Sequence, residues 1–315
     1  MAVEAVRNGG ASIKSSAIRR ALNFVGWARG RAYTAYEKQL KEEIAARKLP
    51  EHVAIIMDGN RRYARKLGLS TDEGYDYGAG ITERVIEWCF ECGVKQLTLY
   101  AFSIENFSRT EDELEKLFEL MRTKFDKICV DERFHRNEVH MRVIGNISLL
   151  PESVRAAIRR AEAATERYNT FTLFVAVAYS GRMEIVDSMR IIAHLVERGL
   201  LAPEDIDEDT IARHLYISQI AEETDAASSG AKTPVDLIIR TGGELRISNF
   251  VPWQALGNEC TAYFCAPFWP EFRRLDLLRA IRTYQERENE HWHRSHSRVS
   301  QLKRLLGRDA RSSAR

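Results

Sequence analysis

Short apolar runs alternate with helical periodicity along most of this chain, beginning near residue 50. The runs cover residues 53–57, 96–102, 139–144, 172–178, 235–239 and 261–264. Several are apolar at both alternating positions, which predicts strands that are covered on both faces. Strands that alternate with helices are typical of a parallel sheet, so the pattern predicts an α/β fold with a central, mainly parallel sheet.

Four segments between these runs predict amphipathic helices. Gly93 and Gly199 are expected to end the first and the fourth helix, and Thr110 with Glu113 predicts a capping box before the second. The first face holds two cysteines without a second pair, which favours a buried helical face over a metal site. The four faces are formed by Ile81, Val85, Trp88, Cys89 and Cys92; Leu114, Leu117, Phe118, Met121, Phe125 and Ile128; Val154, Ala157, Ile158 and Ala161; and Val186, Met189, Ile192, Ala193 and Val196.

The domain organisation predicted from these patterns is a helical N-terminal extension over residues 1–49, one folded domain over 50–290 and a tail over 291–315. Residues 217–234 are polar, and we interpret them as a mobile loop within that domain because strand-like sequence resumes at Val235. No internal repeat is visible.

The composition narrows the class of protein. The chain has 315 residues, of which 44% are hydrophobic and 29% charged, as in ordinary globular proteins and unlike disordered or collagen-like chains. No run of about 18 apolar residues is present, so a membrane-spanning helix is not expected. Five cysteines are too few for a disulfide framework, which favours a reducing compartment and a cytoplasmic protein.

The net charge of +2 hides an uneven distribution. Residues 1–50 hold ten Lys and Arg against four Asp and Glu, residues 273–315 hold twelve against five, and the segment between them carries −11. Basic arms of this kind are either solvated tails or segments attracted to an anionic membrane surface or to nucleic acid. Scattered apolar residues at 18–47 favour a helix or helix pair that lies against another surface, and the start of the chain is not typical of a signal peptide.

Polar and charged residues that could bind a ligand or act in catalysis follow the ends of the apolar runs. Parallel sheets bind their ligands at these strand ends. The first run ends in Asp58-Gly59-Asn60-Arg61-Arg62. Backbone N–H groups at a helix start, strengthened by the two arginines, form an anion site. Asp58 in that setting would hold a divalent metal bridging phosphate oxygens. Taken alone, however, the same residues could form an ordinary turn.

Two further runs end in similar groups. A hydroxyl, a carboxylate, a carboxamide and an arginine follow the second run as Ser103, Glu105, Asn106 and Arg109. Around a Gly-Gly turn after the fifth run, Arg240, Arg246 and Ser248 could form a second phosphate cradle. No Walker A loop or G-x-G-x-x-G motif is present, so ordinary nucleotide binding gains no support.

With these motifs the chain resembles the cis-prenyltransferases, the undecaprenyl diphosphate synthase family, over roughly residues 50–290 and most closely in its archaeal and eukaryotic form. The resemblance implies a six-stranded parallel sheet, surrounding helices and a hydrophobic tunnel. It also implies a Mg²⁺-dependent enzyme that condenses isopentenyl diphosphate onto an allylic diphosphate such as farnesyl or geranylgeranyl diphosphate. The expected product is a long polyprenyl diphosphate with cis double bonds, the precursor of a glycosyl carrier lipid. The motifs are His52–Ala64, Tyr100–Phe107, Asp236–Glu244, Arg246–Phe250 and Phe268–Phe272.

The resemblance also implies roles for individual residues. Asp58 would be the essential metal-linked carboxylate, Glu259 the second metal-linked carboxylate, and Asn106 the group that assists proton removal. The allylic diphosphate would lie at Gly59, Asn60, Arg61 and Arg62 with Tyr63 and Tyr75 nearby; Ser103, Ile104, Glu105, Phe107 and Arg109 would shape the reacting centre; and Arg240, Arg246, Ile247 and Ser248 would bind isopentenyl diphosphate. Candidate tunnel walls are the faces Ile81/Val85/Trp88/Cys89 and Leu117/Phe118/Met121/Phe125, although such stripes are also typical of plain core.

Three departures from the family pattern bear on substrate preference and assembly. Tyr75 stands where the family usually has histidine, and Thr71 where it often has arginine. Both concern the allylic site, so an altered course, with a short-chain or non-head-to-tail product, is an alternative. The C-terminal Arg-x-Gly of homodimeric members has no clear equivalent in Arg287-Glu288-Asn289. We expect a homodimer, with later arginines such as Arg294 or Arg308 supplying the group, or alternatively a heteromer.

Other classes of protein fit less well. A helical trans-type prenyltransferase would need Asp-Asp-x-x-Asp motifs, and the sequence contains no Asp-Asp pair. A non-catalytic, lipid-binding partner subunit would be expected to lose the metal carboxylate and the Arg-Thr-Gly-Gly cradle, which are both present. No nucleic-acid-binding motif accompanies the basic arms. We therefore expect an enzyme in peripheral contact with the cytoplasmic membrane surface, where a long polyprenyl product would be received.

Overall fold

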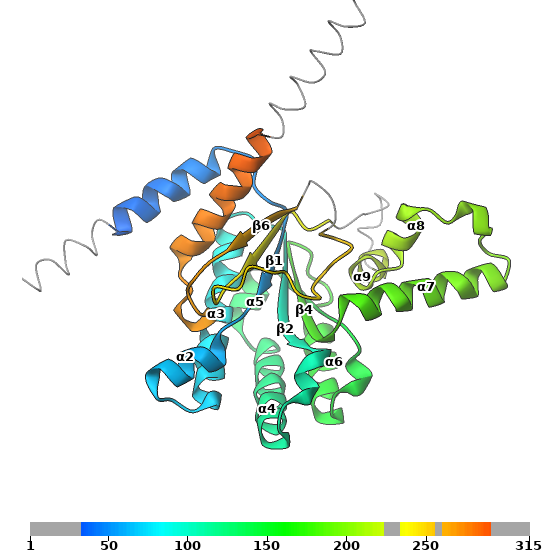
Figure 1. The fold of residues 1–315 in the computed structure, drawn as a ribbon, viewed down its shortest axis with the longest axis horizontal. Coiled ribbons are helices and arrows are strands. Elements are labelled where there is room, and N and C mark those ends of the chain that lie inside the picture. The colour runs from blue at the N-terminus through cyan, green and yellow to red at the C-terminus, as the bar shows by residue number, and fades with distance from the viewer. Residues whose placement is uncertain (1–32, 224–233, 256–259, 291–315) are drawn as a thin grey trace, which may run out of the picture. The chain divides into compact units, whose positions relative to one another are not determined.

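The described part of the computed structural model covers residues 33–223, 234–255 and 260–290 (Figure 1). It divides into two compact units, the first ending at Arg47 and the second beginning at Lys48. The first contains a helix at residues 33–45. The second contains all the strands and every predicted site residue that the structure describes.

A six-stranded sheet with the order β3-β4-β2-β1-β5-β6 forms the centre of the second unit. Every neighbouring pair is parallel. The predicted α/β class is therefore confirmed, and each of the six apolar runs forms one strand. The strands are β1 (His52–Ile56), β2 (Gln96–Ser103), β3 (Val139–Ile144), β4 (Phe171–Tyr179), β5 (Leu237–Arg240) and β6 (Thr261–Phe264).

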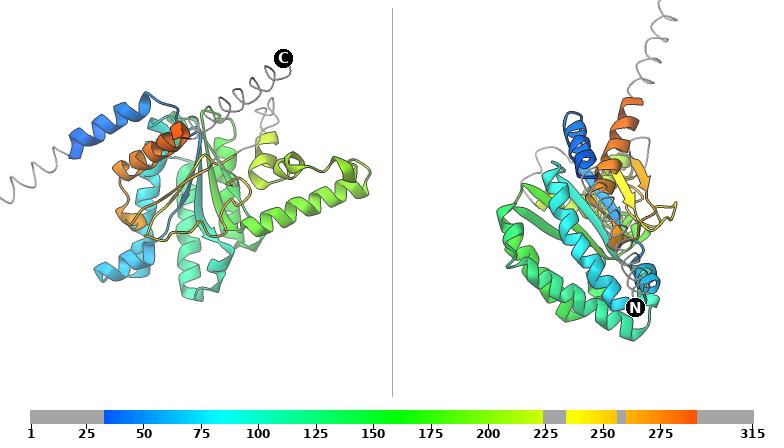
Figure 2. Two further views of the ribbon diagram at one scale, coloured as in Figure 1. Left: turned by 45° about the horizontal axis from the view of Figure 1, so that its top comes forward. Right: turned by 90° about the vertical axis from the view of Figure 1, so that its left-hand side faces the viewer.

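Helices occupy the crossovers from β1 to β5, as is usual between parallel strands, whereas the described residues between β5 and β6 form turns without a helix. Figure 2 shows α3 and α4 along one side of the sheet. The α-helices are α2 (Asn60–Leu67), α3 (Thr71–Glu91), α4 (Glu111–Ile128), α5 (Glu132–Arg136), α6 (Glu152–Thr165), α7 (Gly181–Glu197), α8 (Glu208–Arg213), α9 (Tyr216–Glu223) and a helix at 274–290. Short 3-10 turns are η1 (Ile104–Ser108), η2 (Ile147–Leu149), η3 (Pro203–Asp205) and η5 (Trp269–Glu271).

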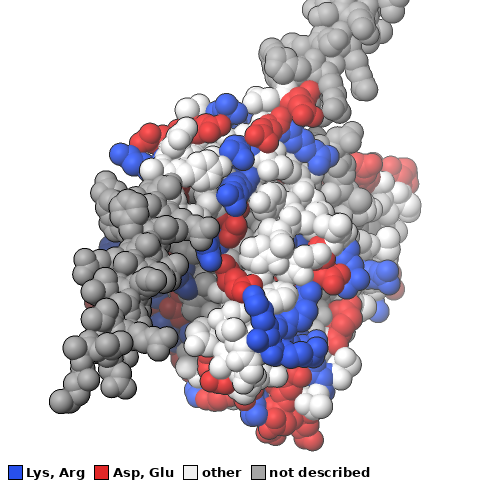
Figure 3. Space-filling view, turned by 60° about the vertical axis from the view of Figure 1, so that its left-hand side comes forward, with Lys and Arg blue, Asp and Glu red and all other residues white. Residues whose placement is uncertain are grey.

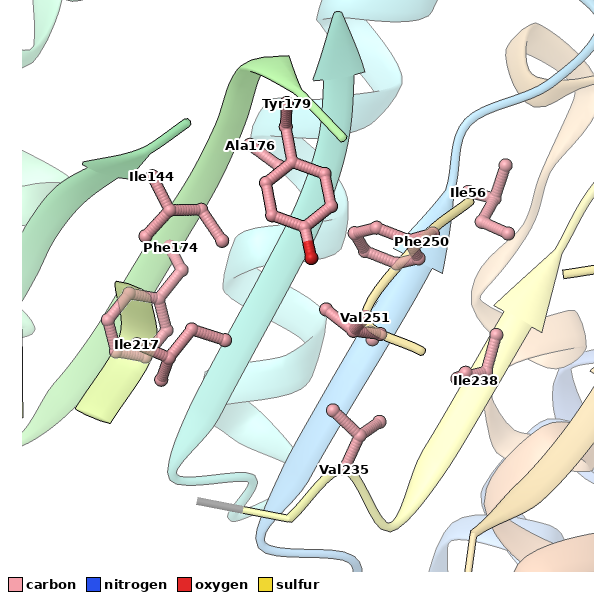
Figure 4. Close-up of a cluster of buried hydrophobic side chains, with 11 residues drawn as sticks. Ile56, Ile144, Phe174, Ala176, Tyr179, Ile217, Val235, Ile238, Phe250 and Val251 are labelled. Carbon is pink, nitrogen blue, oxygen red and sulfur yellow. The ribbon is translucent and has the colours of Figure 1, made fainter. Parts of the chain in front are cut away.

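The alternation of side chains along β4 separates two different environments. Phe174 and Ala176 point into a dry cluster that also holds Ile56 of β1, Ile217 of α9 and Phe250 (Figure 4). The neighbouring positions Leu173, Val175 and Val177 line a cavity on the other face. Because successive residues of a strand face opposite sides, an apolar run with no polar positions supplies both the core and the cavity wall.

Helix capping follows the sequence in part. Gly93 and Gly199, with φ of +84° and +66°, stand just after α3 and α7, as predicted. Thr110 accepts a hydrogen bond from the Glu113 N–H at 3.4 Å, so it caps α4. The predicted reciprocal bond of a capping box is not formed, because the Glu113 carboxylate turns toward Arg109 and Tyr75 instead.

The polar connection predicted at 217–234 is partly wrong. Its first residues belong to α9, and residues 224–233 lie outside the described part of the chain. Leu215 and Ile217 are 1% and 0% exposed. Tertiary burial of two apolar side chains is enough to hold a short helix that local composition does not predict.

The predicted apolar face of α7 is wrong except at Ile192, which is 5% exposed. Val186 and Met189 are 38% and 53% exposed, whereas Glu184 and Ser188 are fully buried. Both stripes have helical spacing, so periodicity alone cannot choose between them. The stripe that contains Glu184 is the buried one, because the Glu184 carboxylate has hydrogen-bond donors inside the protein.

Glu184 lies beneath the segment that follows β5. Its carboxylate accepts hydrogen bonds from the Tyr179 hydroxyl at 2.5 Å, the Tyr216 N–H at 3.0 Å and Gln254 Nε2 at 3.1 Å. Burial raises the pKa of Glu184 to about 7, and the three donors limit that rise. The carboxylate thus joins β4, α7, α9 and residue 254 in one buried network.

Glu184→Gln should remove a pH dependence of stability. Because the folded-state pKa lies above the ordinary value of 4.5, folding favours the protonated acid. The wild-type free energy of unfolding should therefore fall between about pH 4.5 and 7 and stay lower above that, by a few kcal/mol at about 1.36 kcal/mol per pKa unit. The glutamine variant keeps the shape and should lack this fall. Urea unfolding at pH 5 and pH 8 tests it; equal pH dependence in both proteins would show that Glu184 does not titrate in this range.

The basic arms predicted at the two ends lie mostly outside the described residues. On the face drawn in Figure 3, Lys and Arg side chains are interspersed with Asp and Glu. In the described part of the chain, no helix has the length and hydropathy needed to cross a membrane.

Candidate active site

Three of the predicted motifs meet at the carboxyl edge of the sheet. Strand β1 lies between β2 and β5, so the loops that leave these three strands are neighbours. Asp58 follows β1, Ser103 to Arg109 follow β2, and Arg240 ends β5. The parallel topology thus brings together residues that lie up to 182 positions apart in the sequence.

Asp58 is held between two arginines. Its Oδ1 lies 3.0 Å from Arg62 Nη2, and its Oδ2 lies 2.9 Å from Arg240 Nη2. The carboxyl side chain is 29% exposed, whereas that of Arg240 is 6% exposed. Because two arginines face one carboxylate, an excess of positive charge remains at this edge of the sheet.

Glycines allow the two loops to approach each other closely. Gly59 and Gly242 have φ of +113° and +85°, in a region that favours glycine. A Cβ on Gly242 would stand 2.6 Å from Arg62 Nη2. Arg62 Nη1 donates to the Gly242 carbonyl at 2.9 Å, and Thr241 Oγ1 donates to the Asp58 carbonyl at 2.7 Å. These two hydrogen bonds between the loops hold Asp58 in position.

Arg240 is the centre of the second predicted cradle. Its Nη1 donates to Ser248 Oγ and to the Arg246 carbonyl, both at 2.7 Å, while its buried Nε has no partner in the described residues. Ser248 takes a left-handed φ of +56° to meet it. Arg246 itself is 68% exposed and pairs with Glu244 at 3.3 Å. Arg240 and Ser248 come together as expected, and the Arg246 side chain lies at the rim.

The residues after β2 have mainly local contacts. Asn106 Oδ1 accepts from the Ser103 N–H at 3.1 Å within η1. Glu105 Oε1 lies 3.5 Å from Asn249 Nδ2, which links η1 to the segment after β5. The Phe107 ring packs against Phe102 with centroids 5.0 Å apart. Ile104 in η1 and Ile247 beside Ser248 are both half-buried.

Tyr75 forms a compact triad with Arg109 and Glu113. The Tyr75 hydroxyl donates to Glu113 Oε1 at 2.6 Å, and Arg109 Nη1 donates to the same carboxylate at 3.0 Å and to the Tyr75 oxygen. Burial and the Glu113 carboxylate raise the pKa of Tyr75 well above its ordinary range. The phenol at this position therefore stays neutral. The sequence predicted Glu113 only as a helix-capping residue, although its position four residues after Arg109 also indicates an ion pair on one helix face.

The remaining residues of the first motif, Asn60, Arg61 and Tyr63, belong to helix α2. Asn60 Oδ1 is buried without a hydrogen-bond partner in the described residues, and it faces Gly78 of α3. Arg61 is exposed, and the Tyr63 ring lies edge-on to Tyr77 with centroids 5.7 Å apart.

A mainly apolar cavity of about 190 Å³ opens beside this site, between the sheet and helices α3 and α4. Of the predicted walls, Leu117, Met121 and Phe125 line it. The predicted wall on α3 is wrong, because Ile81, Val85 and Cys89 are 3%, 0% and 0% exposed and do not line the cavity. Helix α3 instead lines the cavity with Tyr75, with the small residues Gly78, Ala79 and Thr82 and, further along, with Glu83 and Ile86.

Gly78→Ala should disturb the packing around Asn60, where α3 lines the cavity. A Cβ at Gly78 would stand 2.3 Å from Asn60 Oδ1 and 3.1 Å from Trp269 Cδ1. Relieving that overlap should cost about 1–3 kcal/mol of stability. We also expect it to displace Asn60 and raise the KM for an allylic diphosphate. Gly80→Ala is the matched control on the same helix, because nothing lies within 4 Å of its Cβ. Thermal melts and KM values check the pair; equal values for both variants would contradict the role of Gly78.

No cluster of three or more His, Cys, Asp or Glu suited to a metal occurs among residues 33–223, 234–255 and 260–290. Glu259, the predicted second metal ligand, lies outside them. Cys89 and Cys92 are buried free thiols, in agreement with the predicted helical face.

Comparisons with known proteins connect this geometry to chemistry. A prenyltransferase family model, described as undecaprenyl diphosphate synthase, matches residues 56–292. The chain is 50% identical over 275 residues to the tritrans,polycis-undecaprenyl-diphosphate synthase (geranylgeranyl-diphosphate specific) of Methanosarcina mazei, covering 87% of this chain and 89% of that protein. The protein of the same name from Methanopyrus kandleri is 48% identical, with 81% and 89% covered.

A solved structure shares the fold. The lavandulyl diphosphate synthase of Lavandula x intermedia, in complex with dimethylallyl diphosphate, superposes with a TM-score of 0.67 at 35% identity. The match covers 75% of this chain and 95% of that one.

Proposed function

Because this chain belongs to the undecaprenyl diphosphate synthase family of cis-prenyltransferases, we propose that it extends geranylgeranyl diphosphate with isopentenyl diphosphate to a long polyprenyl diphosphate. The preferred primer is inferred from the archaeal relatives. The observation that carries the proposal is the Arg62–Asp58–Arg240 arrangement at the edge of an apolar cavity. Charged groups for diphosphates and an apolar space for a hydrocarbon chain thereby lie side by side.

The chemistry requires one bond to break and another to form. The allylic carbon–oxygen bond breaks, a carbon–carbon bond forms to isopentenyl diphosphate, and a proton leaves the newly joined unit. Arg62 and the backbone N–H groups at the start of α2 would hold the departing diphosphate and neutralise its charge. Arg240 and Ser248 would hold the second substrate in reacting geometry. Asn106, in η1 after β2, would assist the proton transfer.

Asp58 suits a Mg²⁺ ion that is shared with substrate oxygens. Magnesium in phosphate enzymes is commonly held by one or two carboxylates together with phosphate oxygens and water, so a lone protein carboxylate is sufficient. Asp58 is accessible and lies beside arginines that would bind the same phosphates. Bound there, Mg²⁺ would stabilise the negative charge of the leaving diphosphate.

Incorporation of labelled isopentenyl diphosphate tests the proposed function. Wild-type protein with Mg²⁺ should extend geranylgeranyl diphosphate better than farnesyl or dimethylallyl diphosphate, and EDTA should stop incorporation. A short or branched product from dimethylallyl diphosphate would instead support the alternative course of condensation. If the protein incorporated no label with any primer, alone or with a partner subunit, the proposed enzymatic activity would be contradicted.

Met189→Glu should test the proposed homodimer. The residues Met183, Val186 and Met189 of α7 are 36%, 38% and 53% exposed, which is unusual for large apolar side chains that share one helix. A second copy covering them would bury this surface, and a buried glutamate would prevent it. Light scattering should give a dimer for wild type and for the control Leu67→Glu, and a monomer for Met189→Glu. A monomeric wild type would contradict the proposal.

The basic segments at the two ends of the chain favour binding of the enzyme to the cytoplasmic membrane surface. Attraction of Lys and Arg to anionic lipids is worth about 1 kcal/mol per residue near the surface. Removal of residues 1–45 should release the protein from anionic vesicles, whereas condensation on a short soluble primer should continue.

A further inference from the structure

Asn249 joins the segment after β5 to the start of helix α7. That helix begins at Gly181, and its first N–H groups have no partner within the helix. The Asn249 carbonyl accepts a hydrogen bond from the Gly181 N–H at 3.0 Å, and Asn249 Oδ1 accepts one from the Arg182 N–H at 3.0 Å. Its Nδ2 donates to Ser180 Oγ at 2.6 Å and lies 3.5 Å from Glu105 Oε1 in η1. A residue from a distant part of the sequence thus caps α7 from outside.

The backbone around Asn249 has a conformation that few residues adopt without support. Ser248 and Val251, neither of them a glycine, have φ of +56° and +41°. Left-handed backbone at such residues costs free energy and persists where the surrounding contacts hold it in place. Phe250 and Val251 are 0% exposed and belong to the buried cluster of Figure 4. The segment is therefore held by these apolar side chains and by the hydrogen bonds of Asn249.

The start of α7 has room for this segment because it carries no side chain there. A Cβ on Gly181 would stand 2.1 Å from Pro252 Cδ and 3.2 Å from the Asn249 carbonyl oxygen. Glycine allows so close an approach of the two backbones. The segment and the helix therefore lie in direct contact, and the Asn249 amide fixes the position of one against the other.

We propose that Asn249 is a positioning residue that holds Ser248 and Arg240 in the geometry that binds isopentenyl diphosphate. This inference rests on the proposed function, because that function assigns the cradle to this substrate. Ser248 Oγ and the Arg246 carbonyl both accept hydrogen bonds from Arg240 Nη1 at 2.7 Å, so the segment also orients the guanidinium. Without the Asn249 amide, the left-handed backbone at Ser248 would relax and its hydroxyl would move away from Arg240.

Asn249→Ala tests the proposal, with Asn146→Ala as the matched control. Asn146 also follows a strand of the sheet, and its side chain accepts a local hydrogen bond from Ser148 Oγ at 2.6 Å. Asn249→Ala should raise the KM for isopentenyl diphosphate about 10-fold, as expected when one or two hydrogen bonds that orient a binding group are lost. The KM for geranylgeranyl diphosphate should stay unchanged, because Asp58 and Arg62 keep their contacts. Asn146→Ala should leave both KM values unchanged.

The two KM values separate positioning from stability. Loss of the cap on α7 is expected to lower the melting temperature, but an unfolded fraction of the enzyme lowers kcat and leaves both KM values as they are. In a double-mutant cycle, Asn249→Ala should have a smaller effect on the KM in a Ser248→Ala background, because the amide acts through that hydroxyl. Additive effects would contradict the proposal.

Ser180→Ala keeps the inference falsifiable if Asn249→Ala does not fold. Ser180 Oγ accepts hydrogen bonds from Asn249 Nδ2 at 2.6 Å and from the Met183 N–H at 3.4 Å, and it lies outside the cradle of Arg240 and Ser248. A smaller rise in the KM for isopentenyl diphosphate is therefore expected. A wild-type KM in the folded variants, or an equal rise for both substrates, would overturn the positioning role. A wild type without condensation would overturn the proposed function instead.

Discussion

Asp58→Asn should lower kcat about 10²–10³-fold, the usual cost of losing one group that stabilises charge in a transition state. The asparagine keeps the shape of the side chain but loses the charge that would bind Mg²⁺. Its amide would also turn donor hydrogens toward one of the two arginines that now lie 3.0 and 2.9 Å from the carboxylate. Steady-state rates with labelled isopentenyl diphosphate measure the effect.

Glu244→Gln is the control for Asp58→Asn. Glu244 is a neighbouring carboxylate, 3.9 Å from Arg62 and 3.3 Å from Arg246, and its side chain is 36% exposed. Neutralising it should change the rate only a few-fold, because exposed ion pairs contribute little. A near-UV circular dichroism spectrum like that of the wild type would show that Asp58→Asn is folded. Folded Asp58→Asn protein with a wild-type rate would remove Asp58 from the mechanism.

Arg240→Lys should raise the KM for isopentenyl diphosphate about 10–100-fold, as expected when a fixed guanidinium fork is replaced by a single ammonium group. Arg240 divides its hydrogen bonds among Asp58, Ser248 and the Arg246 carbonyl, all within 2.9 Å. A lysine has the charge but cannot reach all three acceptors. Initial rates at varied isopentenyl diphosphate separate KM from kcat.

A double-mutant cycle with Ser248→Ala shows whether Arg240 acts through its cradle. If Ser248 positions Arg240, the effect of Ser248→Ala should be smaller in the Arg240→Lys background than in the wild type. Additive effects would mean that the two residues act independently. An unchanged KM in Arg240→Lys would contradict the assignment of this arginine to isopentenyl diphosphate.

The sheet and the meeting of the motifs could be predicted because both depend on features of the sequence that repeat or persist. Apolar runs such as 172–178 specify buried strands whatever their neighbours are. Once the strands are parallel and adjacent, Asp58 and Arg240 must lie at one edge. The order of the strands could not be derived from periodicity, and the resemblance to the family implied only their number and parallel direction; the order is known from the structure.

The cavity wall on α3 could not be predicted from the apolar pattern, because large apolar side chains fill a core whereas a cavity needs room beside its wall. The large apolar stripe Ile81, Val85 and Cys89 fills space and is buried. In the middle of the α3 wall the cavity is lined by the small residues Gly78, Ala79 and Thr82, which no hydrophobic pattern marks. A similar reversal on α7 buries Glu184. Two of its three hydrogen-bond donors, Tyr216 and Gln254, come from residues distant in the sequence.

The most direct test of the whole account is the structure of the product that the wild-type enzyme makes from geranylgeranyl diphosphate and ¹³C-labelled isopentenyl diphosphate in Mg²⁺. Mass spectrometry and NMR of that product give the number of added units and the geometry of each new double bond. We predict a polyprenyl diphosphate in which every added unit is cis, formed about 10²–10³-fold more slowly by Asp58→Asn. Trans double bonds in the added units, or formation of the product by Asp58→Asn at the wild-type rate, would contradict the account.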